Sequence, residues 1–253
     1  MKRTAIRTIA MGLMTVPLAF SLAACGSKSS GAADIASSQA LPTVAAPAGT
    51  EWSSVIAKTP EGGYRMGNPD APIKLVEYAA LSCSHCAEFA KESFPPLREN
   101  YIASGRVSYE IRFFMLNPWD FAATMLTLCG SDEAVIPLAE QFWAWQPNMF
   151  QNAQAAGDAR VQAISSLPRD KQFVALAQVA KMDEFFASRG ISKDQGAQCL
   201  AKVETAKALA DATEKAGTEK EITGTPTFFI NGSKLGSMGW SELEAKLQKA
   251  GAR

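Results

Sequence analysis

The sequence predicts an α/β fold with an all-helical segment inserted between two parts that contain strands. Strand patterns occur before residue 117 and return near residue 226. Between them, from residue 119 to about residue 216, the apolar residues show only helical spacing. The predicted order is therefore β-α-β, a block of helices, then β-β-α, and no internal repeat is visible.

Local patterns place the individual elements. In the first part we expect a short strand near Tyr64 between glycine-rich turns, a strand over 73–79, a helix over 84–103 interrupted by Pro95 and Pro96, and a strand over 107–115. In the helical block we expect helices over 119–128, 132–145, 171–189 and 193–216, the last with a break. In the last part we expect a strand over 226–230, a hairpin turn at Asn231-Gly232, a strand over 234–238, and a helix capped by Ser241 that runs to Lys249.

The composition is that of an ordinary globular protein. Of the 253 residues, 47% are hydrophobic and 20% are charged, which excludes collagen-like, fully disordered and small disulfide-scaffold proteins. Lys and Arg together number 25, as do Asp and Glu, so the chain lacks the basic charge that nucleic-acid binding requires. Five cysteines and one histidine are the unusual counts, and their positions carry most of the functional argument.

The first 24 residues have the pattern of a secretory signal peptide. Basic residues stand at positions 2, 3 and 7, an apolar run covers 9–20, and small residues precede Cys25. The run is too short to span about 30 Å of hydrocarbon. Leu22-Ala-Ala-Cys25 resembles the bacterial lipobox, which implies that Cys25 is lipid-modified and anchors the mature chain to a membrane. The alternative is a soluble exported protein in which Cys25 stays free.

The domain organisation follows from the shift in composition after the signal. Residues 25–50 are mostly Ser, Ala, Gly and Pro, which cannot bury a core, so we expect a flexible tether there. About 200 residues remain, enough for one domain with a large insertion. We expect residues 51–117 and 217–253 to form one domain, and residues 118–216 to form the helical insertion.

A C-x-x-C motif carries the chemistry. Cys83-Ser84-His85-Cys86 lies where a predicted strand gives way to a helix. A thiolate at a helix N-terminus is stabilised by unpaired N–H groups and by the helix dipole, which lowers its pKa. The spacing lets Cys83 face solvent while Cys86 stays beneath it. His85 is the only histidine of the chain and could stabilise the Cys83 thiolate, although a lone histidine is more often structural.

Two segments and the order of the elements point to a family. The segment 71–86, the helical block, and Gly-Thr-Pro-Thr-Phe-Phe at 224–229 together resemble the DsbA-like thiol:disulfide oxidoreductases of bacterial envelopes. The resemblance covers roughly residues 62–250. It implies a thioredoxin fold with an inserted helical domain, and a cis peptide bond between Thr225 and Pro226 that faces the active site and positions substrate.

The resemblance also implies an activity. It implies an enzyme that transfers disulfides to unfolded or folding secreted proteins and is recycled by a membrane redox partner. Cys83 would be the nucleophile that forms the mixed disulfide, Cys86 would resolve it, and His85 would tune the Cys83 thiolate. No external cofactor is implied, because the disulfide is itself the redox group.

Glu77 is a further candidate catalytic residue. In the predicted strand it shares a face with apolar Leu75 and Ala79, so we expect it to be buried. Burial raises the pKa of a carboxyl group, which can then exchange protons near neutral pH. Family members carry an acid here, which implies that Glu77 assists deprotonation of Cys86. The alternative is a carboxylate at the strand end that reaches water.

The dipeptide between the cysteines departs from the commonest family pattern. That pattern is Pro-His, whereas this chain has Ser84-His85. The dipeptide tunes the stability of the reduced state, so a strongly oxidising potential is not implied. Thr225 is a second reason not to infer a strongly oxidising potential, since a threonine before the cis proline also occurs in disulfide isomerases and reductases. Oxidant, reductase and isomerase therefore stay open.

Cys129 and Cys199 both lie in the helical block. In an exported protein two remaining cysteines are expected to pair, and some DsbA-like proteins carry an extra disulfide in this domain. Buried, reduced thiols are the alternative. A four-cysteine zinc site with the C-x-x-C pair is disfavoured by the long, irregular gaps between the cysteines.

Two functions of other classes stay open as well. A metal-carrying or metal-sensing module could use the Cys83 and Cys86 thiolates, with His85 as a further candidate ligand, and elemental analysis would reveal its metal. The second function is that of an adaptor protein that kept the fold but lost catalytic turnover. A Cys83→Ser variant as active in vivo as the parent would indicate such an adaptor.

Overall fold

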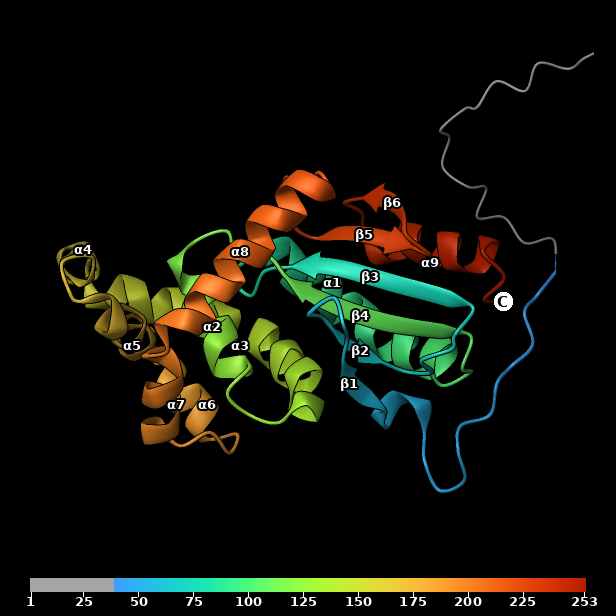
Figure 1. The fold of residues 1–253 in the computed structure, drawn as a ribbon, viewed down its shortest axis with the longest axis horizontal. Helices are drawn as coiled ribbons and strands as arrows, with labels where there is room; N and C mark the ends of the chain where they lie inside the picture. The colour runs from blue at the N-terminus through green and yellow to red at the C-terminus, as the bar shows by residue number, and fades with distance from the viewer. Residues whose placement is uncertain (1–38) are drawn as a thin grey trace, which may run out of the picture. The chain divides into compact units, whose positions relative to one another are not determined.

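A six-stranded mixed sheet organises residues 39–253, which are the residues that the computed structural model describes (Figure 1). In spatial order the strands are β1 (Ile56–Lys58), β2 (Tyr64–Met66), β4 (Val107–Phe113), β3 (Ile73–Ala79), β5 (Thr227–Ile230) and β6 (Ser233–Gly236). Of the five neighbouring pairs of strands in this sheet, β3 and β4 are parallel and the other four pairs are antiparallel. The predicted α/β class, with helices between the two strand-containing parts, is confirmed.

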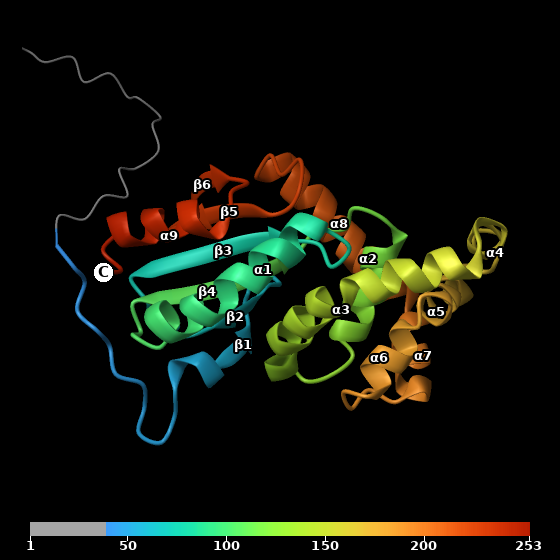
Figure 2. The same cartoon turned by 180° about the vertical axis from the view of Figure 1, so that it is seen from behind.

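The helices fall into three groups around this sheet. Helices α1 (Ser84–Pro96) and α9 (Trp240–Lys249) cover one face (Figure 2). Beyond one end of the sheet gather α2 (Pro118–Thr127), α3 (Val135–Ala156), α4 (Asp158–Ile164), α5 (Arg169–Val179), α6 (Met182–Ala187) and α7 (Lys193–Leu200). Helix α8 (Val203–Glu219) returns the chain to the other face, where its Ala216 packs in a small cluster with Tyr78 and Phe229. Short η1 (Trp52–Ser54), η2 (Leu97–Ile102) and η3 (Asp132–Ala134) complete the helices.

Strand β3 is the central element that leads to the C-x-x-C motif. Its alternating and β-branched residues favour a pleated strand with one fully buried face. Ile73, Leu75 and Ala79 are at most 1% exposed, and β3 is flanked by β4 and β5 on both edges. Helix α1 packs against this buried face through Phe89 and Phe94. The strand end and the helix start are thereby held rigidly next to each other.

The predicted helix over 84–103 is two elements in the structure. Helix α1 ends at Pro96, and the chain continues as the π-helical segment η2. Pro95 and Pro96 have no N–H to donate to the preceding turn, so the regular hydrogen-bond ladder cannot continue past them. The interruption expected at the two prolines is therefore present.

Three other expectations about helices were wrong in detail. The single helix expected over 171–189 is divided into α5 and α6, because Lys181 adopts a left-handed conformation with φ of 56°. The helix expected to end at residue 145 continues to Ala156. Ser241 does not cap the last helix, which begins one residue earlier at Trp240 after Gly239. Strand β1 and helix α4 were not predicted, since both are short and weakly patterned.

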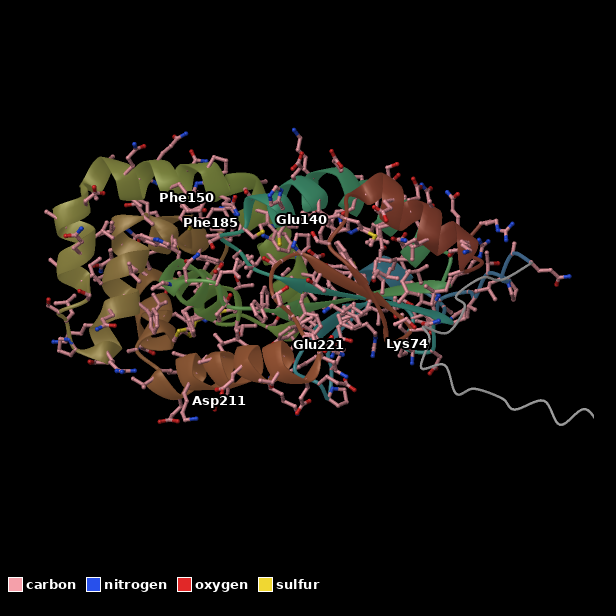
Figure 3. The ribbon with its side chains drawn as sticks, turned by 90° about the horizontal axis from the view of Figure 1, so that it is seen from above. Lys74, Glu140, Phe150, Phe185, Asp211 and Glu221 are labelled. Atoms are coloured by element: carbon pink, nitrogen blue, oxygen red, sulfur yellow. A yellow bond between two sulfur atoms is a disulfide. The ribbon has the colours of Figure 1, made fainter. Side chains whose placement is uncertain are left out.

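Aromatic side chains fill the core of the helical segment. Phe142 on α3 contacts Phe185 and Phe186 on α6 with ring centroids 5.4 and 5.7 Å apart, and Trp145 lies 4.7 Å from Phe185. Phe185 is labelled in Figure 3, as is Phe150, which lies farther along α3 and is 42% exposed. The cluster makes one continuous core with the sheet.

The described residues also lie in one compact unit, so the domain boundaries at residues 117/118 and 216/217 stay a prediction.

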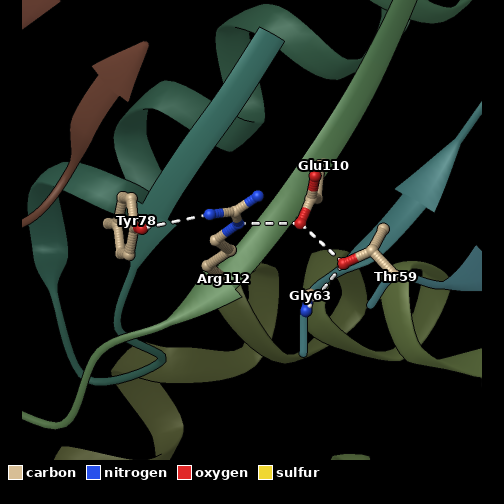
Figure 4. A network of polar contacts seen from close by, with 5 residues as sticks. All are labelled: Thr59, Gly63, Tyr78, Glu110 and Arg112. Atoms are coloured by element: carbon tan, nitrogen blue, oxygen red, sulfur yellow. Dashed lines mark hydrogen bonds and ion pairs between the residues drawn. The ribbon is translucent and has the colours of Figure 1, made fainter. Parts of the chain in front are cut away.

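A polar network fixes the short β1–β2 hairpin against the sheet (Figure 4). Thr59 and Arg112 both donate to Glu110 Oε1, at 2.8 and 2.7 Å, and Arg112 also donates to the Tyr78 hydroxyl at 3.2 Å. The backbone N–H of Gly63 donates to Thr59 Oγ1 at 3.0 Å. A Cβ at position 63 would collide with the Glu110 side chain, so the approach requires glycine.

Part of the predicted tether lies against the folded chain. The N–H of Leu41 donates to the carbonyl of Gly251, and that of Val44 donates to Ser104, both at 2.9 Å. The indole of Trp52 donates to the Val44 carbonyl at 2.7 Å. Residues 41–44 are therefore attached to the folded part by backbone hydrogen bonds, and the Leu41 side chain packs against its hydrophobic core. The expected signal peptide, residues 1–24, and the expected lipidation site Cys25 lie outside the described residues.

Candidate active site

Cys83 stands immediately before helix α1, at the end of the loop that follows β3. It is the N-cap residue, with extended backbone angles, and its sulfur accepts a hydrogen bond from the N–H of Cys86 at 3.4 Å. The Cys83 sulfur also lies 3.3 Å from the carbonyl oxygen of Thr225, to which it donates when it is protonated. Both Cys83 and Cys86 are free thiols in this structure.

The pKa of Cys83 is lowered from 9.0 to about 5. The largest cause is a hydrogen bond from the Cys86 thiol, and the Thr225 side chain and the backbone N–H groups of Cys86 and His85 add to it. Partial burial opposes the shift. These donors belong to the first turn of α1 and to the Thr225 loop, so the helix N-terminus stabilises the thiolate as the sequence predicted.

Cys86 has the opposite character. Its side chain is fully buried, and burial raises its pKa well above the usual value. The hydrogen bond to Cys83 and the charges of Glu77 and Cys83 raise it further. At neutral pH the pair therefore consists of a thiolate at Cys83 and a protonated thiol at Cys86. Cys83 is only 9% exposed, so it faces solvent less than the sequence predicted, whereas Cys86 is fully buried.

Glu77 lies fully buried on β3, as the strand pattern predicted. Burial raises its pKa from 4.5 to about 8, a hydrogen bond from Tyr109 partly offsets this, and the charge of Cys83 adds to it. Tyr109 on β4 donates to Glu77 Oε2 at 2.7 Å, while Oε1 has no hydrogen-bond partner among the described residues. The group is thus a neutral acid near pH 7 that can gain or lose a proton.

His85 is placed differently from the other candidates. Its side chain is 79% exposed, and Nδ1 lies 3.8 Å from an oxygen of Glu88. The backbone N–H of His85, rather than its ring, contributes to the low pKa of Cys83. The structure therefore brings Cys83, Cys86, Glu77 and Thr225 together around the sulfurs and leaves the imidazole at the rim.

The Thr225–Pro226 loop forms the other wall of the site. The peptide bond between these residues is cis. Pro226 lines a groove of about 340 Å³ beside the N-terminal half of α1. The other lining residues are His85, Glu88, Phe89, Glu92, Ser237, Met238 and Gly239. The lining thus combines apolar side chains with two carboxyl groups of α1, and it includes His85 of the motif and Pro226 of the cis peptide.

Cys129 and Cys199 are joined by a disulfide, 70 positions apart in sequence. The bond links the end of α2 to α7. It leaves neither sulfur available as a thiolate ligand, so the four-cysteine zinc site is not formed in this structure. Among residues 39–253, no group of three or more His, Cys, Asp or Glu side chains is arranged to hold a metal ion.

Three side chains near Cys83 were missed by the sequence analysis. Asp120 on α2, and Trp143 and Gln146 on α3, form hydrogen bonds to the loop that precedes Cys83. Asp120 has a local signal, since Asn117-Pro118-Trp119-Asp120 is a capping box at the start of α2. Nothing local indicates that it also contacts Ser82.

Comparison with known proteins identifies the family. A family model described as thioredoxin matches residues 59–249, which is most of the chain. The chain belongs to the thioredoxin family. A crystal structure of a protein-disulfide isomerase from Novosphingobium aromaticivorans is 28% identical, with a TM-score of 0.69, over 73% of this chain and 94% of that one. The fold is accordingly that of a thioredoxin-family member with the expected helical insertion.

More distant relatives agree on the fold. A crystal structure of alpha-DsbA1 from Wolbachia pipientis has a TM-score of 0.61 and 22% identity, over 76% of this chain and 92% of that one. A protein of Rickettsia conorii named "Putative protein-disulfide oxidoreductase" is 24% identical over 78% of this chain and 63% of its own length. A Rickettsia bellii relative of the same type matches over 67% of its length. The chain thus spans about two thirds of these relatives.

Proposed function

We propose that the chain is a thiol:disulfide oxidoreductase that exchanges disulfides with exported proteins through Cys83 and Cys86. The observation that carries the proposal is the contrast between the two sulfurs. Cys83 has a pKa of about 5 and lies at a helix N-terminus, while Cys86 is buried and stays protonated. Cys83 can thus act as the nucleophile and as a stable leaving group, and Cys86 can attack a mixed disulfide formed at Cys83.

In the oxidising direction the pair begins as a Cys83–Cys86 disulfide. A substrate thiolate attacks Cys83 Sγ, the bond to Cys86 breaks, and a mixed disulfide with substrate forms. A second thiolate of the substrate then attacks the substrate sulfur of the mixed disulfide and releases Cys83 as a thiolate. Two electrons pass from the substrate thiols to the pair, so the substrate gains one disulfide and the enzyme holds two reduced sulfurs.

Glu77 handles the proton of the buried sulfur in this proposal. When Cys86 leaves as a thiolate it must be protonated away from bulk water, and Glu77 is neutral and protonated near pH 7. In the reverse direction the Glu77 carboxylate accepts that proton before Cys86 attacks the mixed disulfide. The charge interaction between Glu77 and Cys86 supports the pairing of these two groups.

Thr225 and Pro226 hold substrate against Cys83. An extended segment can lie along this loop with its cysteine at the sulfur and its neighbouring residues in the groove beside α1. The Thr225 side chain lowers the pKa of Cys83, and its buried hydroxyl oxygen has no other hydrogen-bond partner among the described residues. His85 lies at the mouth of the same groove, where its ring can act on the thiolate once substrate covers it.

The low pKa of Cys83 favours an oxidant. A stabilised thiolate stabilises the reduced pair, which makes the disulfide more easily reduced. The structural similarity to a protein-disulfide isomerase at 28% identity makes isomerisation the second candidate, because an isomerase uses the same reduced thiolate to attack wrong disulfides. A reductase is the third use of the same chemistry.

The location is part of the proposal. We place the enzyme in the bacterial envelope, exported by residues 1–24 and held on a membrane by a lipid at Cys25, with a membrane redox partner that restores its active state. The signal pattern supports this location. Among the described residues, no helix has the length and hydropathy needed to cross a bilayer.

A glutathione equilibrium titration of the Cys83–Cys86 pair tests the function. A potential near −120 mV would indicate a strong oxidant, and one near −270 mV a reductase. A Cys86→Ala variant should accumulate mixed disulfides with exported proteins, whereas a Cys83→Ser variant should accumulate none. Stoichiometric metal bound by the two cysteines, or full activity of Cys83→Ser, would contradict the proposal.

A further inference from the structure

The loop between β3 and α1 is held by side chains of the helical segment. Residues 80–83 connect Ala79 at the end of β3 to the start of α1, and each of them is at most 9% exposed. A buried loop cannot satisfy its backbone polar groups with water, so it needs partners from the protein. Those partners come from α2 and α3.

Two side chains of α3 satisfy the carbonyl groups of the loop. Trp143 Nε1 donates to the Ala80 carbonyl at 3.0 Å. Gln146 Nε2 donates to the Leu81 carbonyl at 2.7 Å and to the Cys83 carbonyl at 3.1 Å. Gln146 is 4% exposed, and its amide therefore bridges the two carbonyls that flank Ser82.

One side chain of α2 satisfies Ser82. Asp120 Oδ1 accepts from the Ser82 N–H at 2.6 Å, and Oδ2 accepts from the Ser82 hydroxyl at 3.0 Å. The same Oδ2 accepts from the N–H groups of Leu116 and Asn117, at 3.0 and 3.2 Å. Asn117 Nδ2 in turn donates to the Ser82 hydroxyl at 2.7 Å. The buried carboxylate thus joins the start of α2 to the residue before the nucleophile.

We propose that Asp120 and Gln146 are positioning residues that set the reactivity of Cys83 from the helical segment. They touch neither sulfur nor substrate. They fix the backbone on both sides of Ser82, and so hold Cys83 in the extended N-cap conformation that places its sulfur over the first turn of α1. The proposal rests on the proposed use of Cys83 as a nucleophile, and it gives the helical segment a direct part in the chemistry.

The geometry explains why position matters for this sulfur. The N–H of Cys86 meets Cys83 Sγ at 3.4 Å, a contact that exists only while Cys83 caps the helix. If the loop moves, the sulfur leaves the N–H groups of the first turn, and the thiolate loses the donors that stabilise it. A loosened loop should therefore make Cys83 less acidic.

The test measures the acidity of Cys83 directly, with Gln146→Met and Asp120→Asn. Gln146→Met removes the amide donor at nearly constant volume, and Asp120→Asn replaces one acceptor with a donor that faces N–H groups. The readout is the rate of alkylation of Cys83 by iodoacetamide from pH 3 to pH 9, with the site of reaction assigned by mass spectrometry. At pH 5 we expect each variant to react about two-fold more slowly than the parent, or slower still.

Ser192→Ala is the matched control for stability. Ser192 caps α7 by accepting from the Gln195 N–H at 3.2 Å, so its loss also weakens the helical segment, but Ser192 does not touch the loop. We expect it to lower the free energy of unfolding in urea while its alkylation profile matches the parent. If either loop variant fails to fold, Trp143→Phe removes the indole donor to the Ala80 carbonyl and keeps an aromatic ring at this buried position, and the same slower alkylation at pH 5 is expected.

The outcomes separate this proposal from the proposed function. Profiles of the folded loop variants that match the parent would overturn the positioning role, and so would faster alkylation of Asp120→Asn at pH 5, which would indicate a charge effect. Alkylation needs no turnover. If the parent failed to transfer disulfides, the proposed function would fall, while the alkylation profiles would still decide whether Asp120 and Gln146 position Cys83.

Discussion

Replacing Glu77 by glutamine should stabilise the folded protein at neutral pH. The carboxyl group is fully buried, and its pKa is raised from 4.5 to about 8, mainly by burial. A raised pKa means that the folded state binds a proton which the unfolded state has released. Glu77→Gln keeps an amide oxygen that can accept from Tyr109, but removes the group that must hold this proton.

The magnitude follows from the pH window. Stability from the protonated carboxyl is fully present below pH 4.5 and is lost as pH rises toward 8. Each pH unit inside this window lowers the free energy of unfolding by about 1.4 kcal/mol. At pH 7 Glu77 therefore costs roughly 3 kcal/mol, and at pH 5 less than about 1 kcal/mol. Glu77→Gln should recover these amounts.

Urea unfolding of the two proteins at pH 5, 6 and 7 measures the difference. The gap in unfolding free energy should open by roughly 2 to 3 kcal/mol between pH 5 and pH 7. Glu88→Gln is the control, because the same chemical change on a 71% exposed side chain should leave the pH dependence unaltered. Parallel curves for Glu77→Gln and the parent would refute the assignment of Glu77 as a buried neutral acid.

Three further predictions concern the site and the insertion. Thr225→Val should raise the pKa of Cys83, because the Thr225 side chain lowers it. The pH midpoint of iodoacetamide alkylation should then move up from about 5, and an unmoved midpoint would contradict this effect of Thr225. Replacing Cys129 and Cys199 by serine should lower the free energy of unfolding by about 4 kcal/mol, as the entropy of a loop of 70 positions predicts, and chemical denaturation would show it. Glu88→Lys should slow oxidation of model peptides that carry lysine beside their cysteine and should speed that of acidic peptides, because Glu88 lines the groove; equal changes in both rates would exclude a role in charge selection.

The parts of the site that depend on local pattern could be predicted from sequence. The alternation in 73–79 placed the strand at its observed bounds, and the same two-residue period placed Glu77 on the buried face. The C-x-x-C motif after this strand gave the helix N-terminus, since a strand followed by a helix leaves unpaired N–H groups at the motif. These predictions need only neighbours in the chain.

The parts that depend on long-range contact could not be predicted. Gln146 lies 65 positions from Leu81, and no periodicity marks a glutamine whose amide bridges two distant carbonyls. The division of the helix at Lys181 is of the same kind, because a lysine in a left-handed conformation has no sequence signal and is held by the packing around it. The orientation of His85 is also beyond local pattern: its position between the cysteines is plain in the sequence, but only the fold shows that its side chain is 79% exposed, and its role on the thiolate stays a prediction.

The attachment of Leu41 to Gly251 fixes where the described chain enters the fold relative to Cys83. The chain enters the folded part beside the C-terminus, at the edge of the sheet where β3 begins, whereas Cys83 follows the opposite end of β3. The seven residues of β3 separate these two ends by about 23 Å. The chain that leads into the fold is thereby attached at the end of β3 away from Cys83, and residues 41–44 leave the approach to the sulfur open.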